Sequence, residues 1–181
     1  MNSICIFCGS SFGNNKDFIK IAEETGKYFA EKNIQLIYGG GNVGLMGTVS
    51  NTVMSSGGKT IGVIPQFMMN KEIANFNVTE LIQVKSMHER KAKMADLSDG
   101  FIVLPGGIGT MDEFFEIWTW KQLKIHSKPI GILNFAGYYD PMLSFVKDMI
   151  AKGFLSQEKF DEIDVADSLP VLVDKMNSRS K

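Results

Sequence analysis

Gly100-Phe101-Ile102-Val103-Leu104-Pro105-Gly106-Gly107-Ile108-Gly109-Thr110-Met111-Asp112-Glu113 is the stretch that decides the fold of this chain. Its first five residues are almost all apolar and have the length of a strand, and residues 110–125 have the apolar spacing of a helix. A turn rich in glycine joins the two. A strand without a polar face that leads through a short turn into a helix is typical of a parallel sheet covered by helices.

The same alternation of strand and helix patterns extends outward along the chain. The expected strands are residues 3–9, 34–38, 60–65, 78–84, 100–104 and 129–134, with a small one at 162–165. The expected helices are about residues 16–32, 44–56, 86–97, 110–125 and 141–152, with two short helices in 156–181. Right-handed crossovers then predict an α/β fold with a doubly wound, mostly parallel sheet in a Rossmann-like three-layer sandwich. We expect a single domain, residues 1–181, because no linker or repeat is apparent.

The composition narrows the classes of function. The chain has 181 residues and a formal net charge of −1, and it lacks the basic cluster that nucleic-acid binding needs. No apolar stretch approaches the roughly 20 residues of a membrane span, and the first residues carry no charged leader. We therefore expect a cytoplasmic protein that binds neither nucleic acid nor membrane.

The two cysteines form a Cys5-x-x-Cys8 pattern. Redox pairs with this spacing lie at a helix start, whereas this pair lies in an expected strand, where residues three apart point to opposite faces. Zinc needs four ligands, and the chain has only two histidines. We expect both thiols to fill the core, and we expect no metal site.

Three turns rich in glycine follow expected strands. They are Cys8-Gly9-Ser10-Ser11, residues 39–47 (which include Gly41 and Gly44), and Pro105 to Thr110. In a parallel sheet such turns gather at the carboxyl edge, and helix starts there present free N–H groups to an anion. One glycine pair is uninformative because any such loop needs turn residues. Three turns together predict a phosphorylated ligand.

The ligand class can be narrowed further. Gly39-x-Gly41-x-x-Gly44 matches a dinucleotide fingerprint, but it follows the second strand, and Lys59 stands where an acidic ribose ligand would fall. No Gly-Lys-Ser/Thr follows any glycine turn, so a triphosphate loop is not indicated. A mononucleotide or a sugar phosphate fits better than NAD or ATP.

Charged residues beside these turns have two possible roles. Thr110 to Glu113 and Ser86 to Glu89 both read as capping boxes, in which the glutamate only ties down a helix start. Arg90 and Lys91 lie near such a start, where a positive charge is unfavourable unless it meets an anionic ligand. The alternative is a solvated pair on an exposed face. Asp112 and Glu113 diverge by about 100° on a helix, which favours one carboxylate with one arginine as a catalytic set.

With these motifs in view, the sequence resembles the LONELY GUY (LOG) family, also called "lysine decarboxylase-like". That family's signature, Pro-Gly-Gly-x-Gly-Thr-x-x-Glu, is matched at every fixed position by residues 105–113. Met87-His88-Glu89-Arg90-Lys91 resembles its Arg-Lys segment, and residues 39–47 resemble its second glycine turn. Asp112 stands where relatives often have glutamate.

The resemblance implies a phosphoribohydrolase that splits a cytokinin riboside 5′-monophosphate, or AMP, into free base and ribose 5-phosphate. It implies a homodimer that needs no metal or organic cofactor. Arg90 and Glu113 would be catalytic. The expected substrate-binding residues are Ser10, Gly41, Gly44, Glu72, Met87, Lys91, Gly106, Gly107, Ile108, Gly109, Thr110 and Asp112.

Two other functions remain open at this point. A decarboxylase would need a lysine that holds pyridoxal phosphate, and nothing around Lys91 or Lys121 indicates such a site. A nucleotide or cofactor carrier would need the glycine turns but not Glu113. The aromatic residues of the helix at 110–125 spread around most of its circumference, which fits either a central helix or one covered by a partner subunit.

Overall fold

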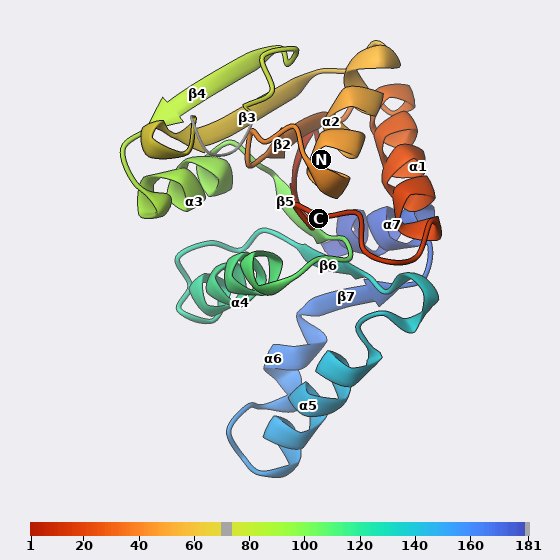
Figure 1. Cartoon of the computed structure of the whole chain (residues 1–181). Helices are drawn as coiled ribbons and strands as arrows, with labels where there is room; N and C mark the ends of the chain where they lie inside the picture. Colours follow the sequence, from red (N-terminus) through yellow and green to blue (C-terminus); the bar gives the residue numbers. More distant parts are fainter. Residues whose placement is uncertain (70–73, 180–181) are drawn as a thin grey trace.

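The computed structural model describes residues 1–69 and 74–179, and one parallel sheet of seven strands forms its centre (Figure 1). The strand order is β4-β3-β2-β1-β5-β6-β7. The strands are β1 Ser3–Phe7, β2 Gln35–Tyr38, β3 Thr60–Pro65, β4 Glu80–Val84, β5 Gly100–Val103, β6 Ile130–Leu133 and β7 Ile163–Ala166. The predicted α/β architecture is confirmed, and all seven strands are parallel.

Helices cover both faces of the sheet (Figure 1). They are α1 Asp17–Glu31, α2 Gly44–Ser55, α3 Met87–Asp96, α4 Ile108–Gln122, α5 Asp140–Ala151, α6 Gln157–Asp161 and α7 Leu169–Arg179, with 3-10 turns η1 Gln66–Met68 and η2 Phe135–Gly137. Helices α1, α2 and α7 pack on one face, and α3, α4 and α5 pack on the other. The result is the predicted three-layer sandwich. In the described part of the chain, no helix is both long and apolar enough to cross a membrane.

The alternation of side chains along β1 supplies both cores. Ile4 and Ile6 pack against α1 and α2, whereas Cys5 and Phe7 face α3 and α4. Cys8, just beyond the strand, belongs to the first of these clusters, and both thiols are free and buried. The prediction that both cysteines fill the core is therefore confirmed. Their side chains lie on opposite faces of the sheet, as the strand geometry requires.

The direction of winding changes between β1 and β5. From β1 the chain adds β2, β3 and β4 on one side, then returns to place β5 against the other side of β1. The turns that follow these two strands therefore meet: the amide of Gly9 donates to the carbonyl of Pro105 at 3.0 Å. Ligands of doubly wound sheets bind at this kind of switch point.

Two of the predicted starts differ from the structure by two residues. Helix α4 begins at Ile108, two residues before the expected Thr110, because Gly107 is its N-cap. Strand β4 begins at Glu80 rather than at residue 78. It is an edge strand with one neighbour, and its residues are half-buried or exposed.

Candidate active site

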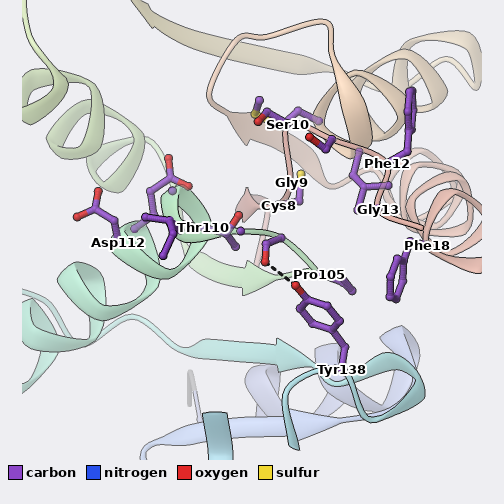
Figure 2. Close-up of a pocket in the computed structure, with 18 of the residues that line it drawn as sticks. Cys8, Gly9, Ser10, Phe12, Gly13, Phe18, Pro105, Thr110, Asp112 and Tyr138 are labelled. Carbon is purple, nitrogen blue, oxygen red and sulfur yellow. Dashed lines mark hydrogen bonds between the residues drawn. The ribbon is translucent and has the colours of Figure 1, made fainter. Parts of the chain in front are cut away.

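A cavity of about 460 Å³ lies at the switch point. Figure 2 shows the turns after β1 and β5 facing each other across it, with Tyr138 on one side. Ten predicted site residues line this cavity: Ser10, Met87, Arg90, Gly106, Gly107, Ile108, Gly109, Thr110, Asp112 and Glu113. The structure thus brings together most of the residues that the sequence singled out. Glu72 lies outside the described residues.

The start of α4 forms one wall of the cavity. Gly107 is the N-cap and has no side chain that could cap this start. The first amides of a helix have no acceptor within the helix, and the helix dipole makes their end favourable for an anion. Ile108 and Gly109 are exposed beside them. This wall can therefore bind a phosphate group through backbone N–H groups.

The capping box predicted for Thr110 and Glu113 does not form. Because α4 starts at Ile108, Thr110 is the third residue of the helix, and its buried side chain packs against Gly106. Glu113 lies on the second turn of α4 and lines the cavity. Its carboxylate is therefore placed beside the ligand space rather than at the helix start.

The glycines of this turn have two different roles. A side chain on Gly106 would place its Cβ 2.1 Å from the hydroxyl oxygen of Thr110 and 2.7 Å from the amide of Gly9. A Cβ on Gly107 or Gly109 would meet nothing within 4 Å, and neither residue has a positive φ. Gly106 is thus required by packing. The open space over Gly107 and Gly109 is where a ligand can approach the backbone closely.

The second glycine turn also has a structural role. The amides of Leu45 and Met46, at the start of α2, both donate to the carbonyl of Gly9, at 3.0 and 3.3 Å. Gly44 has a φ of 56°, and a Cβ there would lie 2.3 Å from the backbone of Ser10. Gly41 and Gly44 do not line the cavity. Leu45 and Met46 of the same turn do line the cavity, so the turn both fits α2 against the first turn and forms part of the cavity wall.

Arg90 is a buried cation in the cavity wall, with only 5% of its surface exposed. Its Nε donates to the carbonyl of Val63 at 3.1 Å, and its Nη2 donates to the carbonyl of Gly39 at 2.6 Å. Val63 lies in the second half of β3, and Gly39 directly follows β2. A Cβ on Gly39 would lie 2.0 Å from the guanidinium, so glycine is needed there. The alternative of a solvated surface arginine is wrong.

Helix α3 begins as predicted, with Ser86 as its N-cap. The Ser86 hydroxyl accepts from the amide of Glu89 at 3.1 Å. The Glu89 carboxylate in turn accepts from the amide of Lys85 at 2.6 Å, one residue before the position that an ideal capping box uses. Glu89 is therefore engaged in holding the helix start, which fixes Arg90 on the first turn.

Lys91 lies outside the cavity and joins the two helices that carry the candidate catalytic residues. Its ammonium group pairs with Asp112 at 3.1 Å and with Glu116 at 2.7 Å. Burial lowers the pKa of Lys91, but the hydrogen bonds to Glu116 and Asp112 outweigh it, and the pKa is raised above its usual value. Sequence reasoning placed Lys91 on the substrate and missed Glu116. The i, i+4 spacing of Asp112 and Glu116 on α4 was the available signal.

Cys8 and Glu113 are electrostatically coupled across the cavity lining. Burial raises the pKa of the Cys8 thiol, and the negative charge of Glu113 raises it further. For Cys5, behind the wall, burial again dominates, Glu113 raises the pKa and Arg90 lowers it. The cavity cysteine is therefore held as a neutral thiol, and the charged groups that act on this region are Glu113 and Arg90.

Three aromatic residues of the cavity were not predicted from the sequence: Phe12, Phe18 and Tyr138. Phe18 and Tyr138 pack edge to face, with their ring centroids 5.4 Å apart. Tyr138 follows β6, whose carboxyl end lies at the same sheet edge as that of β5. The position of Tyr138 soon after a strand was the only sequence signal that could have placed it at the cavity, and no motif surrounds it.

Comparison with known proteins identifies sequence relatives of this chain. The family described as "possible lysine decarboxylase" matches residues 46–176. The cytokinin riboside 5′-monophosphate phosphoribohydrolase LOG1 of Arabidopsis thaliana is 47% identical over 173 residues, which cover 96% of this chain and 81% of that protein. The probable cytokinin riboside 5′-monophosphate phosphoribohydrolase LOGL2 of Oryza sativa subsp. japonica is 46% identical, over 98% of this chain and 72% of that protein.

Solved structures share the fold at lower identity. The molybdenum cofactor carrier protein of Chlamydomonas reinhardtii superposes with a TM-score of 0.72 at 20% identity, over 98% of this chain and 96% of that one. The molybdenum cofactor binding protein of Rippkaea orientalis gives a TM-score of 0.71 at 20% identity, over 97% and 94% of the two chains. At this identity the likeness concerns the fold alone. The sequence relatives decide the family, and the chain belongs to the LOG family, whose matching model carries the description "possible lysine decarboxylase".

Proposed function

We propose that this chain is a phosphoribohydrolase that cleaves the N-glycosidic bond of a nucleoside 5′-monophosphate. The substrate is a cytokinin riboside 5′-monophosphate or AMP, and the products are the free base and ribose 5-phosphate. The names of the relatives support this activity. The observation that carries it in this chain is the shared cavity, where an open helix start for a phosphate adjoins the carboxylate of Glu113 and the buried guanidinium of Arg90.

The α4 start binds the 5′-phosphate in this proposal. The amides of the first helical turn donate to the phosphate oxygens, and the absence of side chains at Gly107 and Gly109 lets the phosphate approach the backbone. Held at this end, the ribose extends toward Glu113. Binding the phosphate in this way orients C1′ for the reaction.

Glu113 acts on the reacting carbon. Cleavage of an N-glycosidic bond builds positive charge on the sugar ring, and a carboxylate close to C1′ stabilises that charge. The same carboxylate orients the attacking water and accepts its proton. The water oxygen bonds to C1′ as the bond from C1′ to the base nitrogen breaks. In sum, hydroxyl is added to the ribose and hydrogen to the base.

Arg90 supplies fixed positive charge. An arginine stays protonated, so it is a poor proton donor to the base. Its two bonds to backbone carbonyls hold the guanidinium in place while other N–H groups remain to face a ligand. We assign it to electrostatic stabilisation of the phosphate or of the departing base, and we place the base near the apolar side chains of Met87 and Met46.

The test is release of free base. The purified protein is incubated with AMP and with isopentenyladenosine monophosphate, and free adenine and free isopentenyladenine are quantified. We expect release from at least one nucleotide. Nucleotide binding without release of base would support the alternative, a carrier, and would refute the hydrolase.

We also propose that two copies of the chain form a homodimer through the outer face of α4. Ile108 is 88% exposed, and with Met111, Phe115 and Trp120 it lines a shallow groove on that face. Leu123, just past the helix, is also largely exposed. An apolar surface of this kind marks an interaction site. Light scattering should give twice the chain mass of 20.1 kDa, and a monomer would refute the dimer.

A further inference from the structure

Two adjacent tyrosines lie over the carboxyl end of β5. Tyr138 and Tyr139 follow the turn η2, in which Ala136 and Gly137 both have positive φ values, of 53° and 70°. The side chain of Asn134 accepts from the amide of Tyr139 at 2.8 Å and so closes this turn. The local backbone therefore fixes where both rings lie. In Figure 2 the hydroxyl of Tyr138 points to the turn after Pro105.

Three successive carbonyls of that turn each accept a hydrogen bond from outside it. The hydroxyl of Tyr139 donates to Leu104 at 2.6 Å, the amide of Gly9 donates to Pro105 at 3.0 Å, and the hydroxyl of Tyr138 donates to Gly106 at 2.7 Å. Together these bonds fix the rotation of the peptide groups that lead into α4.

Fixing a carbonyl also fixes the following amide. The structure has no cis peptide bonds among its described residues, and in a trans peptide the C=O and N–H groups point in opposite directions. The bond from Tyr138 to the carbonyl of Gly106 therefore directs the N–H of Gly107 away from the tyrosine. Gly107 adjoins the open space over the α4 start, where a side chain would meet nothing.

The two tyrosines differ in what they contribute to the fold. Tyr139 is buried, and burial raises its pKa. Tyr138 is 41% exposed, and its hydrogen bond is exposed as well. Its ring is held by edge-to-face packing on Phe18 and on Tyr139, with centroids 5.4 and 4.9 Å away. The ring alone provides that packing, and the hydroxyl makes its hydrogen bond to the turn.

We propose that Tyr138 is a positioning residue, whose hydroxyl orients the Gly106–Gly107 peptide so that its N–H binds the phosphate monoester of the ligand. The inference deepens the proposed function and rests on its placement of the phosphate at the start of α4. The tyrosine acts through the peptide and does not itself bind the phosphate.

The test compares ligands with and without a phosphate on the variant Tyr138→Phe, which keeps the ring and loses the hydroxyl. Loss of one hydrogen bond predicts a rise of about 2- to 12-fold in the Kd of ribose 5-phosphate and in the KM for AMP. The kcat and the affinity for adenosine should stay unchanged. Tyr28→Phe, on α1, is the matched control and should alter none of these values.

Each outcome bears on the proposal. An unchanged Kd for ribose 5-phosphate in Tyr138→Phe, or equal weakening of adenosine and AMP, would overturn the positioning role. So would a wild-type protein that binds no ribose 5-phosphate, whatever the base-release assay shows. If Tyr138→Phe weakens ribose 5-phosphate while the wild-type protein releases no base, the hydrolase proposal fails and the positioning role stands.

Discussion

Replacement of Gly109 by alanine should make the protein more stable and less active. Gly109 is the second residue of α4, its φ is not positive, and a Cβ there would meet nothing within 4 Å. Alanine is favoured over glycine within a helix by about 0.5–1 kcal/mol. For a chain of this size that corresponds to a rise in Tm of about 1–4 °C, measurable by thermal denaturation without ligand.

The same methyl group enters the space assigned to the phosphate. Overpacking of a fitted contact costs about 1–3 kcal/mol, which corresponds to about a 5- to 150-fold weaker affinity. We expect the KM for AMP and the Kd of ribose 5-phosphate to rise within that range. A higher Tm with unchanged ligand affinity would refute the reasoning, because it would show that no ligand occupies the space over Gly109.

Gly57→Ala is the matched control. A Cβ at Gly57 also meets nothing, but the residue has a φ of 81° and lies outside the cavity. An alanine in this left-handed conformation costs about 1–2 kcal/mol. We therefore expect a lower Tm with unchanged ligand affinity, whereas the Gly109 variant should have a higher Tm and a weaker affinity.

Three further predictions concern charged and titratable groups. Glu113→Gln should lower kcat by about 10²- to 10⁴-fold while nucleotide binding, measured by calorimetry, is largely kept; normal turnover would remove the carboxylate from the chemistry. Arg90→Ala should weaken both binding and rate, and in denaturant melts it should cost about 1–3 kcal/mol for each of the two buried carbonyls that it leaves unpaired; unchanged kinetics would remove its role on the ligand. The His126 Nδ1 accepts from the amide of Lys128, so the ring is neutral with its proton on Nε2, which donates to the carbonyl of Ile117. Burial lowers the pKa of His126 below 6.5, so below pH 6.5 the unfolded chain binds a proton that the folded chain does not, and the unfolding free energy falls. His126→Gln should remove that part of the fall between pH 7 and 5.5, and an identical pH dependence would contradict it.

The order of strands and helices could be predicted from the sequence because each buried strand leaves a local apolar pattern. The turn at residues 105–109 could also be predicted, since a strand, a glycine turn and a helix follow one another directly in the sequence. The start of α4 was placed too late, because Thr110 and Glu113 imitate a capping box and a glycine N-cap leaves no side-chain signal.

The remaining differences between expectation and structure concern contacts between distant segments. Gly44 was expected to bind the ligand. In the structure it lies against the backbone of Ser10, 34 positions earlier, where a side chain would not fit. Lys91 reads as a ligand for an anion, and the anions that it meets are Asp112 and Glu116 of the next helix. A local pattern shows that a glycine or a cation is needed, but only the folded chain shows what it faces.

One residue, Gly9, joins the two ends of the cavity. Its amide bonds to the turn before α4, and its carbonyl accepts from both Leu45 and Met46 at the start of α2. The turn before α4 and the start of α2 near Met46 are therefore linked through this one residue. Folding alone sets the distance between them, so a ligand whose length matches this fixed span binds without a further loss of backbone entropy.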